Sequence, residues 1–366
     1  MKFFPKKSFY KRNHYICSMK KKPIFFFLLS PFSLIFGLVA ALRRKLFRPK
    51  IVSITTICVG NLRMGGTGKT PLVEYIVTLL AQNHKVAILS RGYGRKTKGY
   101  ISAHETQNLN INKQIPYNLI IGDEPLQYAT KFPNVDVAVC ENRKTGIEKL
   151  LQKNPKLEVV VLDDAYQYLS VNYSLRILLT EYNRPFFDDY PIPSGRLREF
   201  CCASKHADTI IVSKCPENLT SEEKTEFIKK LKPKPHQEVF FTKINYELNN
   251  SQFSILNSQF SILLITGIDN PTPLVQYIKT QFEDVHTLHF PDHHPFTNRD
   301  IDNIIRLKEK LGGKKCTIIT TEKDAMRLQI FENMPEFFTI PIKISFLENE
   351  TGFKEKLLSL LLHNDA

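Results

Sequence analysis

The pattern of hydrophobic positions after residue 50 predicts an α/β fold. Short β-branched runs, typical of buried strands, alternate with segments whose apolar residues recur every three or four positions, as in amphipathic helices. The first series of strand candidates comprises Val52–Val59, Val86–Leu89, Val135–Val139, Val159–Leu162, Ile177–Leu179 and Thr209–Val212. Strands that alternate with helices form a mostly parallel sheet with helices on both faces.

A second series of strand candidates begins after the basic, proline-containing stretch Lys229–Lys234. It comprises Glu238–Lys243, Ile262–Thr266, Val285–Phe290, Cys316–Thr320 and Phe337–Ile340. The length of this part of the chain suggests two lobes. We expect a core lobe over 49–235 and a second, smaller α/β lobe over 236–366.

A glycine-rich motif joins the first strand candidate to the helix pattern that follows it. Strand, glycine-rich loop and helix are the context of a nucleotide-binding P-loop, whose backbone amides surround phosphate oxygens at a helix N-terminus. The predicted phosphate-binding residues are Gly65, Gly66, Thr67, Gly68, Lys69 and Thr70. Lys69 would reach the β- and γ-phosphates and Thr70 would bind Mg²⁺. Arg63 departs from the motif, because it stands at the position of the first glycine.

A pair of aspartates is the second candidate element of the nucleotide site. Asp163 and Asp164 follow four apolar residues at the C-terminal end of a buried strand, which is where ligands bind in open α/β sheets. A carboxylate there can hold Mg²⁺ directly or through water, together with Thr70. The alternative is an aspartate pair that caps a helix.

The N-terminal part has a different pattern, with an apolar segment between two basic clusters. Ile24–Leu42 carries no charge, and residues 1–50 contain 13 Lys and Arg but no Asp or Glu. Most of the net charge of +15 therefore belongs to a basic extension, 1–23, and to a hydrophobic anchor with a basic flank, 24–48. This distribution, without aromatic-basic repeats, does not indicate nucleic-acid binding. The seven cysteines form no C-x-x-C pair, which argues against a disulfide framework or a zinc site.

Three interpretations of the apolar segment compete. A cleaved signal peptide would export a domain that depends on ATP to a place without ATP. A single transmembrane span would put the basic residues of 1–23 outside, against the positive-inside rule. An interfacial or re-entrant anchor keeps both basic flanks on the anionic cytoplasmic leaflet, and we favour this interpretation.

Eight motifs in a fixed order resemble those of the tetraacyldisaccharide 4′-kinase family of lipid A synthesis. They are GNLRMGGTGKTP (Gly60–Pro71), LSRGYGR (Leu89–Arg95), GDEP (Gly122–Pro125), LDDAYQY (Leu162–Tyr168), PSGRLRE (Pro193–Glu199), TGIDNP (Thr266–Pro271), FPDHHPFT (Phe290–Thr297) and TTEKDAMRL (Thr320–Leu328). The resemblance extends from the apolar segment to about Leu328. It implies a P-loop NTPase-like fold with a second lobe and an N-terminal anchor helix.

The resemblance also implies an activity and a location. The family's kinases transfer the γ-phosphate of ATP to the 4′-hydroxyl of a tetraacylated glucosamine disaccharide 1-phosphate, giving lipid IVA. We therefore expect ATP and Mg²⁺ as cofactors, this lipid as the acceptor, and the anionic lipid surface of the bacterial inner membrane, on its cytoplasmic face, as a partner.

Matching motif positions carry the family's roles to residues of this chain. The resemblance implies that Lys69 and Thr70 are phosphate and Mg²⁺ ligands, that Asp163, Asp164 and Glu199 surround the metal, and that Gln167, Arg91, Arg143 and Arg198 lie near the phosphates or the lipid head group. Asp123 of GDEP and His293 of DHH match the family's catalytic pair. Tyr168 departs from the family, which usually has histidine there.

The chemistry of phosphoryl transfer suits the proposed pair. The acceptor hydroxyl needs a base, and a histidine held by a carboxylate is suited to that role. The alternatives are a polar turn at His293 and His294 and a solvated loop carboxylate at Asp123. Because the two residues are 170 positions apart and lie in different expected lobes, they can meet only if the lobes come together.

A different class of protein shares part of this pattern. Membrane-associated regulatory ATPases of the partitioning type also combine a deviant GGTGKT loop with a basic membrane-binding element. Their loop has a lysine just before the two glycines, where this chain has Met64, and they lack counterparts of GDEP and DHHPF. Such a protein would switch with ATP but would phosphorylate no small molecule.

Overall fold

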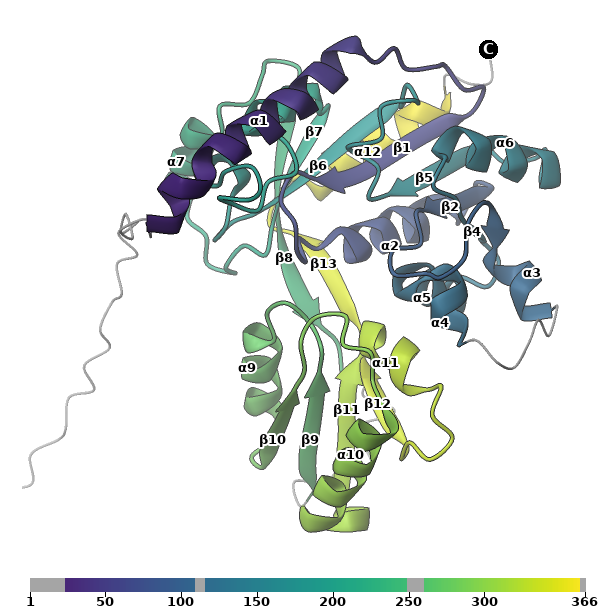
Figure 1. Ribbon diagram of the computed structural model, residues 1–366, viewed down its shortest axis with the longest axis vertical. Helices are drawn as coiled ribbons and strands as arrows, with labels where there is room; N and C mark the ends of the chain where they lie inside the picture. The colour runs from purple at the N-terminus through teal and green to yellow at the C-terminus, as the bar shows by residue number, and fades with distance from the viewer. Residues whose placement is uncertain (1–23, 109–115, 249–259, 363–366) are drawn as a thin grey trace, which may run out of the picture.

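The computed structural model describes residues 24–108, 116–248 and 260–362, which form two α/β lobes and an N-terminal helix (Figure 1). The basic extension 1–23 lies outside the described residues. The larger lobe is built on a nine-stranded sheet with the order β13-β8-β7-β6-β1-β5-β2-β4-β3. Its strands are β1 (Thr55–Asn61), β2 (Val86–Ser90), β3 (Ile101–Ser102), β4 (Asp136–Val139), β5 (Val159–Asp163), β6 (Leu175–Glu181), β7 (Thr209–Ser213), β8 (Glu238–Tyr246) and β13 (Ile342–Phe346).

Most strand pairs of the large sheet are parallel, which confirms the expected α/β architecture. Only the edge pairs β3–β4 and β8–β13 are antiparallel. The alternating strand pattern sends Ile57 and Val59 of β1 to one face of the sheet and Cys58 to the other. Each face therefore needs its own helical cover.

Helices cover both faces of the large sheet. On one face lie α2 (Lys69–Leu80), α5 (Asp123–Lys131) and α12 (Glu350–Leu362). On the other lie α6 (Arg143–Lys153) and α7 (Ser221–Leu231). The short helices are α3 (Ala103–Asn108), α4 (Tyr117–Ile121) and the 3-10 turns η1 (Phe186–Asp188) and η2 (Cys201–His206).

The smaller lobe is a four-stranded, all-parallel sheet with the order β10-β9-β11-β12. Its strands are β9 (Ser261–Thr266), β10 (Val285–His289), β11 (Cys316–Thr321) and β12 (Phe337–Ile340), and its helical segments are α9 (Thr272–Gln281), α10 (Asn298–Lys310), α11 (Glu322–Leu328) and η3 (Gly313–Lys315). Separate apolar clusters lie under α10 and under α9.

The structure divides the chain differently from the expected boundary at 235/236. The first half of β8 pairs with β7 in the large sheet, and its second half pairs with β13 as the chain passes toward the small lobe. Helix α12 returns to the large lobe, where Phe353 and Leu357 are fully buried. The small lobe therefore runs from β9 to β12. The sequence placed the boundary elsewhere because a local apolar pattern identifies a strand but not the sheet that it joins.

The N-terminal helix α1 (Ile24–Leu46) packs on the loop that precedes η2. Ser33 is buried and hydrogen-bonds Ser194 (2.8 Å), and Gly37 lets the Phe200 ring approach so closely that a Cβ at position 37 would clash with it. The opposite side of α1 leaves a row of large apolar side chains exposed: Leu28, Phe32, Ile35, Val39, Leu42 and Leu46.

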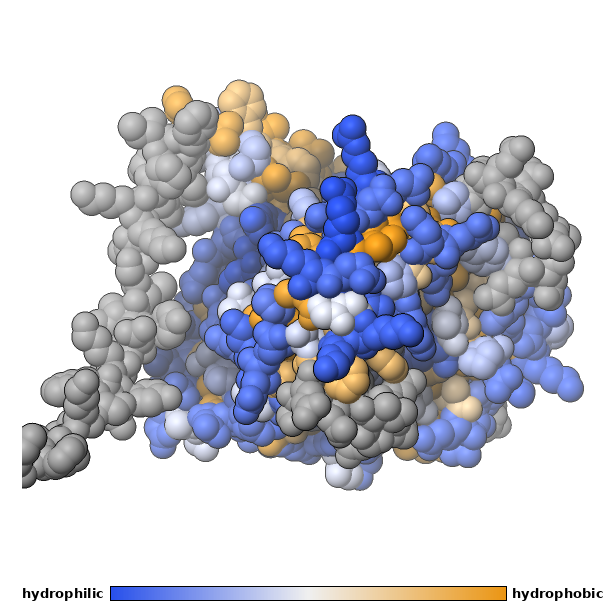
Figure 2. All heavy atoms as spheres, turned by 90° about the horizontal axis from the view of Figure 1, so that it is seen from below, coloured by the Kyte–Doolittle hydropathy of each residue, from blue (hydrophilic) through white to orange (hydrophobic). Residues whose placement is uncertain are grey.

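This exposed row is continuous along one helix face, because its members are spaced alternately by four and three residues. In Figure 2, hydrophobic atoms gather where the chain emerges from the grey N-terminal residues, whereas the nearer surface of the small lobe is mainly hydrophilic. No helix in the described part of the chain is long and apolar enough to cross a bilayer. We call the six residues the apolar row of α1.

Candidate active site

The predicted phosphate loop lies between β1 and α2, at the edge where the parallel strands of the large sheet end. Gly65 (φ 113°) and Gly68 (φ 86°) adopt left-handed conformations that favour glycine. The loop is braced from β7 and its end, because Ser213 Oγ donates to the Thr67 carbonyl (2.8 Å) and Lys214 Nζ donates to the Gly66 carbonyl. The loop shape expected from the sequence is therefore present.

Lys69 and Thr70 begin helix α2, as the motif predicts. Lys69 Nζ lies 3.5 Å from the carboxylate of Asp164, which also accepts two hydrogen bonds from Arg198 Nη1 (2.8 and 2.9 Å). Burial opposes the charge of Asp164, but these two cations outweigh it and hold the pKa of Asp164 below its usual value. Gln167 joins the group by accepting from Arg198 (3.3 Å) and donating to the Asn61 carbonyl (2.8 Å).

Asp163 is buried next to this group, and its pKa is shifted in the opposite direction from that of Asp164. Burial, and then the charge of Asp164, raise the pKa of Asp163 to about 7, although Lys69 opposes the shift. Its Oδ1 is buried without a hydrogen-bond partner among the described residues. A buried carboxylate oxygen without a partner is what a hydrated cation or a water would satisfy.

These residues fit a Mg²⁺ ion that enters with a nucleotide. Within the described residues, no group of three or more His, Cys, Asp and Glu side chains is arranged to hold a metal by itself. Magnesium bound with a triphosphate needs only one or two protein carboxylates, since phosphate oxygens and water supply the rest. Thr70, Asp163 and Asp164 can supply the protein's share.

We expect Asp163→Asn to stabilise the protein in the absence of metal and nucleotide. The folded protein holds the Asp163 proton up to about pH 7, whereas an unfolded chain releases it near pH 4, so that the free energy of unfolding falls as pH rises between these values. The variant lacks this loss and should gain on the order of 2 kcal/mol at pH 8. Thermal unfolding in EDTA at pH 5 and pH 8 measures the effect.

Asp164→Asn is the matched control and should act in the opposite direction, because the folded protein lowers the pKa of Asp164. That variant should be less stable than the wild type at pH 8. A lower melting temperature for Asp163→Asn than for the wild type at pH 8 would contradict the raised pKa of Asp163.

Glu199, an expected metal neighbour, is bound by helix α1 in this structure. Arg44 forms a two-pronged ion pair with its carboxylate (Nε 2.8 Å, Nη2 2.7 Å) and also donates to the Tyr166 carbonyl (3.1 Å). Glu199 is buried. The predicted metal role of Glu199 stays a prediction, and the sequence did not indicate that Arg44, 155 positions away, is its partner.

Two of the predicted arginines differ in setting. Arg143 is buried at the start of α6, donates to the Cys140 carbonyl (2.9 Å) and leaves its Nε without a partner in the described residues. The Tyr168 ring lies 5.7 Å from its guanidinium, and the Tyr168 hydroxyl donates to Asn142 (2.8 Å), the residue that caps α6. Tyr168, which departs from the family pattern, thus supports Arg143. Arg91 directly follows β2 and is exposed.

Arg63 has a structural partner in this fold. Its Nε donates to Asp189 (2.8 Å), and its backbone forms a bridge with Leu197, so that the edge of the phosphate loop is joined to the segment that carries Arg198. The position that departs from the P-loop motif therefore holds the loop to its neighbour.

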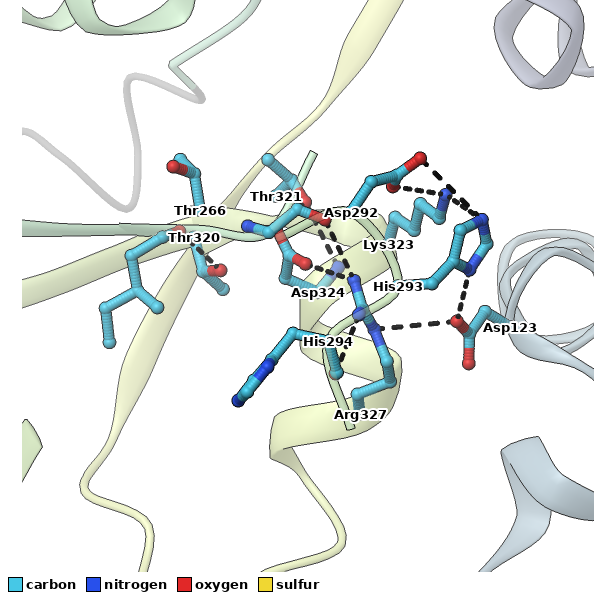
Figure 3. Close-up of polar contacts among 12 residues, drawn as sticks. Asp123, Thr266, Asp292, His293, His294, Thr320, Thr321, Lys323, Asp324 and Arg327 are labelled. Carbon is cyan, nitrogen blue, oxygen red and sulfur yellow. Dashed lines mark hydrogen bonds and ion pairs between the residues drawn. The ribbon is translucent and has the colours of Figure 1, made fainter. Parts of the chain in front are cut away.

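Asp123 and His293 meet across the two lobes (Figure 3). His293 Nδ1 lies 3.3 Å from Asp123 Oδ2, although one residue begins α5 and the other follows β10. Burial opposes the charge of Asp123, but the hydrogen bond from His293, the charge of Arg327 and the amide of Asn118 outweigh it and lower the pKa of Asp123. The expected encounter is thus present in the structure, and the catalytic role stays a prediction.

Arg327 is a site residue that the sequence analysis missed. It is buried on α11, donates to the His294 carbonyl (2.9 Å), pairs with Asp324 and places its Nε 3.5 Å from Asp123. Asp324 in turn accepts from the Gly267 amide (2.9 Å). This network fixes the loop that carries His293 and the end of β9 relative to each other. In the sequence, Arg327 was indicated only by its place in the motif TTEKDAMRL, none of whose residues was assigned an individual role.

A second contact between the lobes involves Asp269, which also was not predicted. It pairs with Arg184 (3.0 Å), which is bound to Glu181 at the end of β6, and a Cβ added to Gly65 would lie 3.3 Å from its carboxylate. The small lobe therefore reaches the edge of the phosphate loop.

These features define a P-loop kinase fold, with a nucleotide loop on one lobe and a histidine contributed by the other. The chain belongs to the LpxK family, tetraacyldisaccharide-1-P 4′-kinases, which it matches over residues 25–362. It is 39% identical to the tetraacyldisaccharide 4′-kinase of Flavobacterium johnsoniae over 92% of this chain and 97% of the relative. It is also 39% identical to that of Bacteroides thetaiotaomicron over 92% of this chain and 93% of the relative.

A solved structure has the same fold. LpxK from Aquifex aeolicus, crystallised in complex with ATP, superimposes with a TM-score of 0.69 at 28% identity and covers 92% of this chain and 99% of that chain. Family, relatives and fold agree on a lipid kinase, and they do not favour a regulatory ATPase of the partitioning type.

Proposed function

We propose that this protein transfers the γ-phosphate of ATP to the 4′-hydroxyl of tetraacyldisaccharide 1-phosphate, at the cytoplasmic face of the bacterial inner membrane. Membership of the 4′-kinase family supports the acceptor, and the ATP complex of the Aquifex relative supports the donor. The observation that carries the mechanism is the contact between Asp123 and His293, which puts a base from the small lobe beside the lobe that has the phosphate loop.

Different residues bind the nucleotide, bind the metal and accept the proton in phosphoryl transfer. The amides of the phosphate loop and Lys69 hold the triphosphate, and Arg143 and Arg198 are the cations at the same sheet edge. Thr70, Asp163 and Asp164 would hold Mg²⁺, which supplies charge neutralisation at the phosphates when bound. His293 accepts the hydroxyl proton as the oxygen attacks the γ-phosphorus, whose bond to the bridging oxygen breaks to release ADP, and Asp123 orients the imidazole.

The direct test is phosphate transfer by the full-length protein in detergent micelles. Radiolabelled ATP and tetraacyldisaccharide 1-phosphate should give a labelled lipid, and ATP turnover without the lipid should be much slower. ATP turnover that does not depend on the lipid, without any labelled product, would contradict the kinase function and favour an ATP-switched regulator.

The apolar row of α1 supports a helix that lies in the membrane interface. The helix binds the enzyme through Ser33, Gly37 and Arg44, so its opposite face is free to enter the lipid. Arg44 of the basic last turn is bound to Glu199, whereas Arg43 and Lys45 of that turn, and Arg48 and Lys50 after it, are exposed. Lysine and arginine beside an apolar helix face attract anionic lipid.

We expect removal of residues 1–48 to release much of the protein from vesicles that contain anionic phospholipid. The deletion also strips Arg44 from buried Glu199, so a second variant is needed that keeps α1 on the enzyme. Ile35→Glu with Leu42→Glu places two charges in the apolar row and leaves that ion pair intact. Flotation with vesicles should show both variants mostly unbound, because charges oppose entry into the interface.

Ile330→Glu is the matched control, since Ile330 is an exposed apolar residue of the small lobe. It should float like the wild type. If the double variant and the truncated protein float as well as the wild type, the membrane surface must lie elsewhere in the folded lobes.

A further inference from the structure

The imidazole of His293 has a contact on the ring nitrogen that faces away from Asp123. Lys323 Nζ lies 2.9 Å from His293 Nε2 (Figure 3). The same ammonium group lies 3.3 Å from Glu124 and 3.2 Å from Asp292. Burial opposes its charge, but Glu124 and Asp292 outweigh burial and raise the pKa of Lys323. Lys323 is therefore a firmly protonated group in contact with the proposed base.

This contact fixes the tautomer of His293. An ammonium group has only donors, so Nε2 must be the accepting, unprotonated nitrogen. The single hydrogen of the neutral ring is then on Nδ1, where it faces Asp123. Nε2 is thus the atom that can accept a proton from an acceptor hydroxyl, and it has one lone pair. Lys323 and a hydroxyl cannot both use it.

We propose that Lys323 is a positioning residue for the base, because its contact with Nε2 keeps His293 neutral and in the required tautomer. When the acceptor hydroxyl binds Nε2, it displaces the Lys323 ammonium group toward Glu124 and Asp292. The proposal rests on the kinase function proposed above. The two carboxylates are already in ion-pair contact with the ammonium, so the displaced lysine keeps partners.

The charges around the imidazole come from three elements. They are Asp123 and Glu124 of α5, Asp292 of the loop after β10, and Lys323 and Arg327 of α11. The uncharged Tyr93 ring packs on the imidazole from the loop after β2, with ring centroids 5.4 Å apart. Glu124 and Asp292 lie 3.8 and 4.0 Å from Nε2 and favour the imidazolium. The ammonium of Lys323 is the nearest group that opposes them.

Removing the ammonium should therefore make His293 easier to protonate. At saturating ATP, the acid limb of kcat/KM for the lipid should move to higher pH by about one unit in Lys323→Met. The loss of rate should therefore be larger at acid pH than at alkaline pH. Lys323→Arg keeps the charge and should keep the acid limb near its wild-type position. Glu124→Gln removes a carboxylate and should move the limb to lower pH.

These opposite directions separate an electrostatic role from a structural one. A merely structural lysine would lower the rate by the same factor at every pH, and that result would overturn the proposal. Shifts of both variants in the same direction would also overturn it.

A second measurement does not depend on activity. Proton–carbon NMR of the histidine rings, with His293 identified from its absence in His293→Ala, follows the titration in the protein without substrates. A higher pKa of His293 in Lys323→Met and a lower one in Glu124→Gln would support the proposal, and unchanged values would overturn it. If these shifts appear but the wild-type protein does not phosphorylate the lipid, the kinase function is contradicted and the charge relation remains.

Discussion

Replacing Lys69 with alanine should lower kcat/KM by about two orders of magnitude or more, on the order of 3 kcal/mol of lost transition-state stabilisation. Lys69 begins α2 directly after the left-handed Gly68, and its ammonium group already contacts Asp164 beside the phosphate loop. Charge that develops on the transferred phosphoryl group would lose its nearest lysine partner. Steady-state kinetics with the lipid in micelles measures the loss.

The fold should survive this substitution. Asp164 keeps its two hydrogen bonds from Arg198, so the substitution does not leave the Asp164 carboxylate without a partner. Lys279→Ala, an exposed lysine on α9 of the small lobe, is the matched control and should be near wild type in rate. Near-normal turnover by a folded Lys69→Ala variant would mean that this loop does not hold the transferred phosphate.

The site residues that come directly after predicted strands in the chain were predictable from the sequence. A β-branched run before GGTGKT and an apolar run before Asp163 and Asp164 each identify a buried strand and its C-terminal end. Parallel neighbours end at the same edge of a sheet, so these residues had to lie close together. The pairing of β1 with β5 satisfies that requirement.

The contacts between distant segments were not predictable in the same way. The ion pair of Arg44 with Glu199 connects helix α1 with a loop 155 residues later in the chain. The hydrophobic pattern of α1 indicates only that the helix is apolar. Lys323 and Arg327 lie on a short charged helix, where charges at helical spacing usually indicate a solvated face. Their burial depends on how the small lobe meets α5, which no local pattern records.

The division between the lobes was mispredicted for a related reason. Val239–Phe241 is an apolar run that fits either sheet, and the structure shows β8 serving the large sheet before the chain turns to the small lobe. Strand β13 and helix α12 then bring the chain back. The composition of a returning segment does not reveal its place in the fold, because the strand with which β13 pairs lies about a hundred residues earlier in the chain.

His293→Ala and Asp123→Ala should each reduce kcat by about a hundredfold or more with little change in ATP affinity. The two side chains touch across the lobes, at 3.3 Å, and neither belongs to the phosphate loop. Since Asp123 acts through the orientation of His293, the loss in the double variant should be much smaller than the product of the single losses. Single-turnover kinetics and nucleotide-binding titrations of the three variants measure both quantities.

The neighbouring histidine is the internal control for this prediction. His294 Nε2 lies 3.1 Å from Asp300, and the ring packs between Phe290 and Phe296, away from Asp123. His294→Ala should therefore lower stability more than kcat, because it removes packing within the small lobe. If the losses from Asp123 and His293 multiply independently, or if His294 is the residue on which kcat depends, the pair does not act as a unit. The base must then be sought among Asp163, Asp164 and Glu199, the acidic residues expected around the metal.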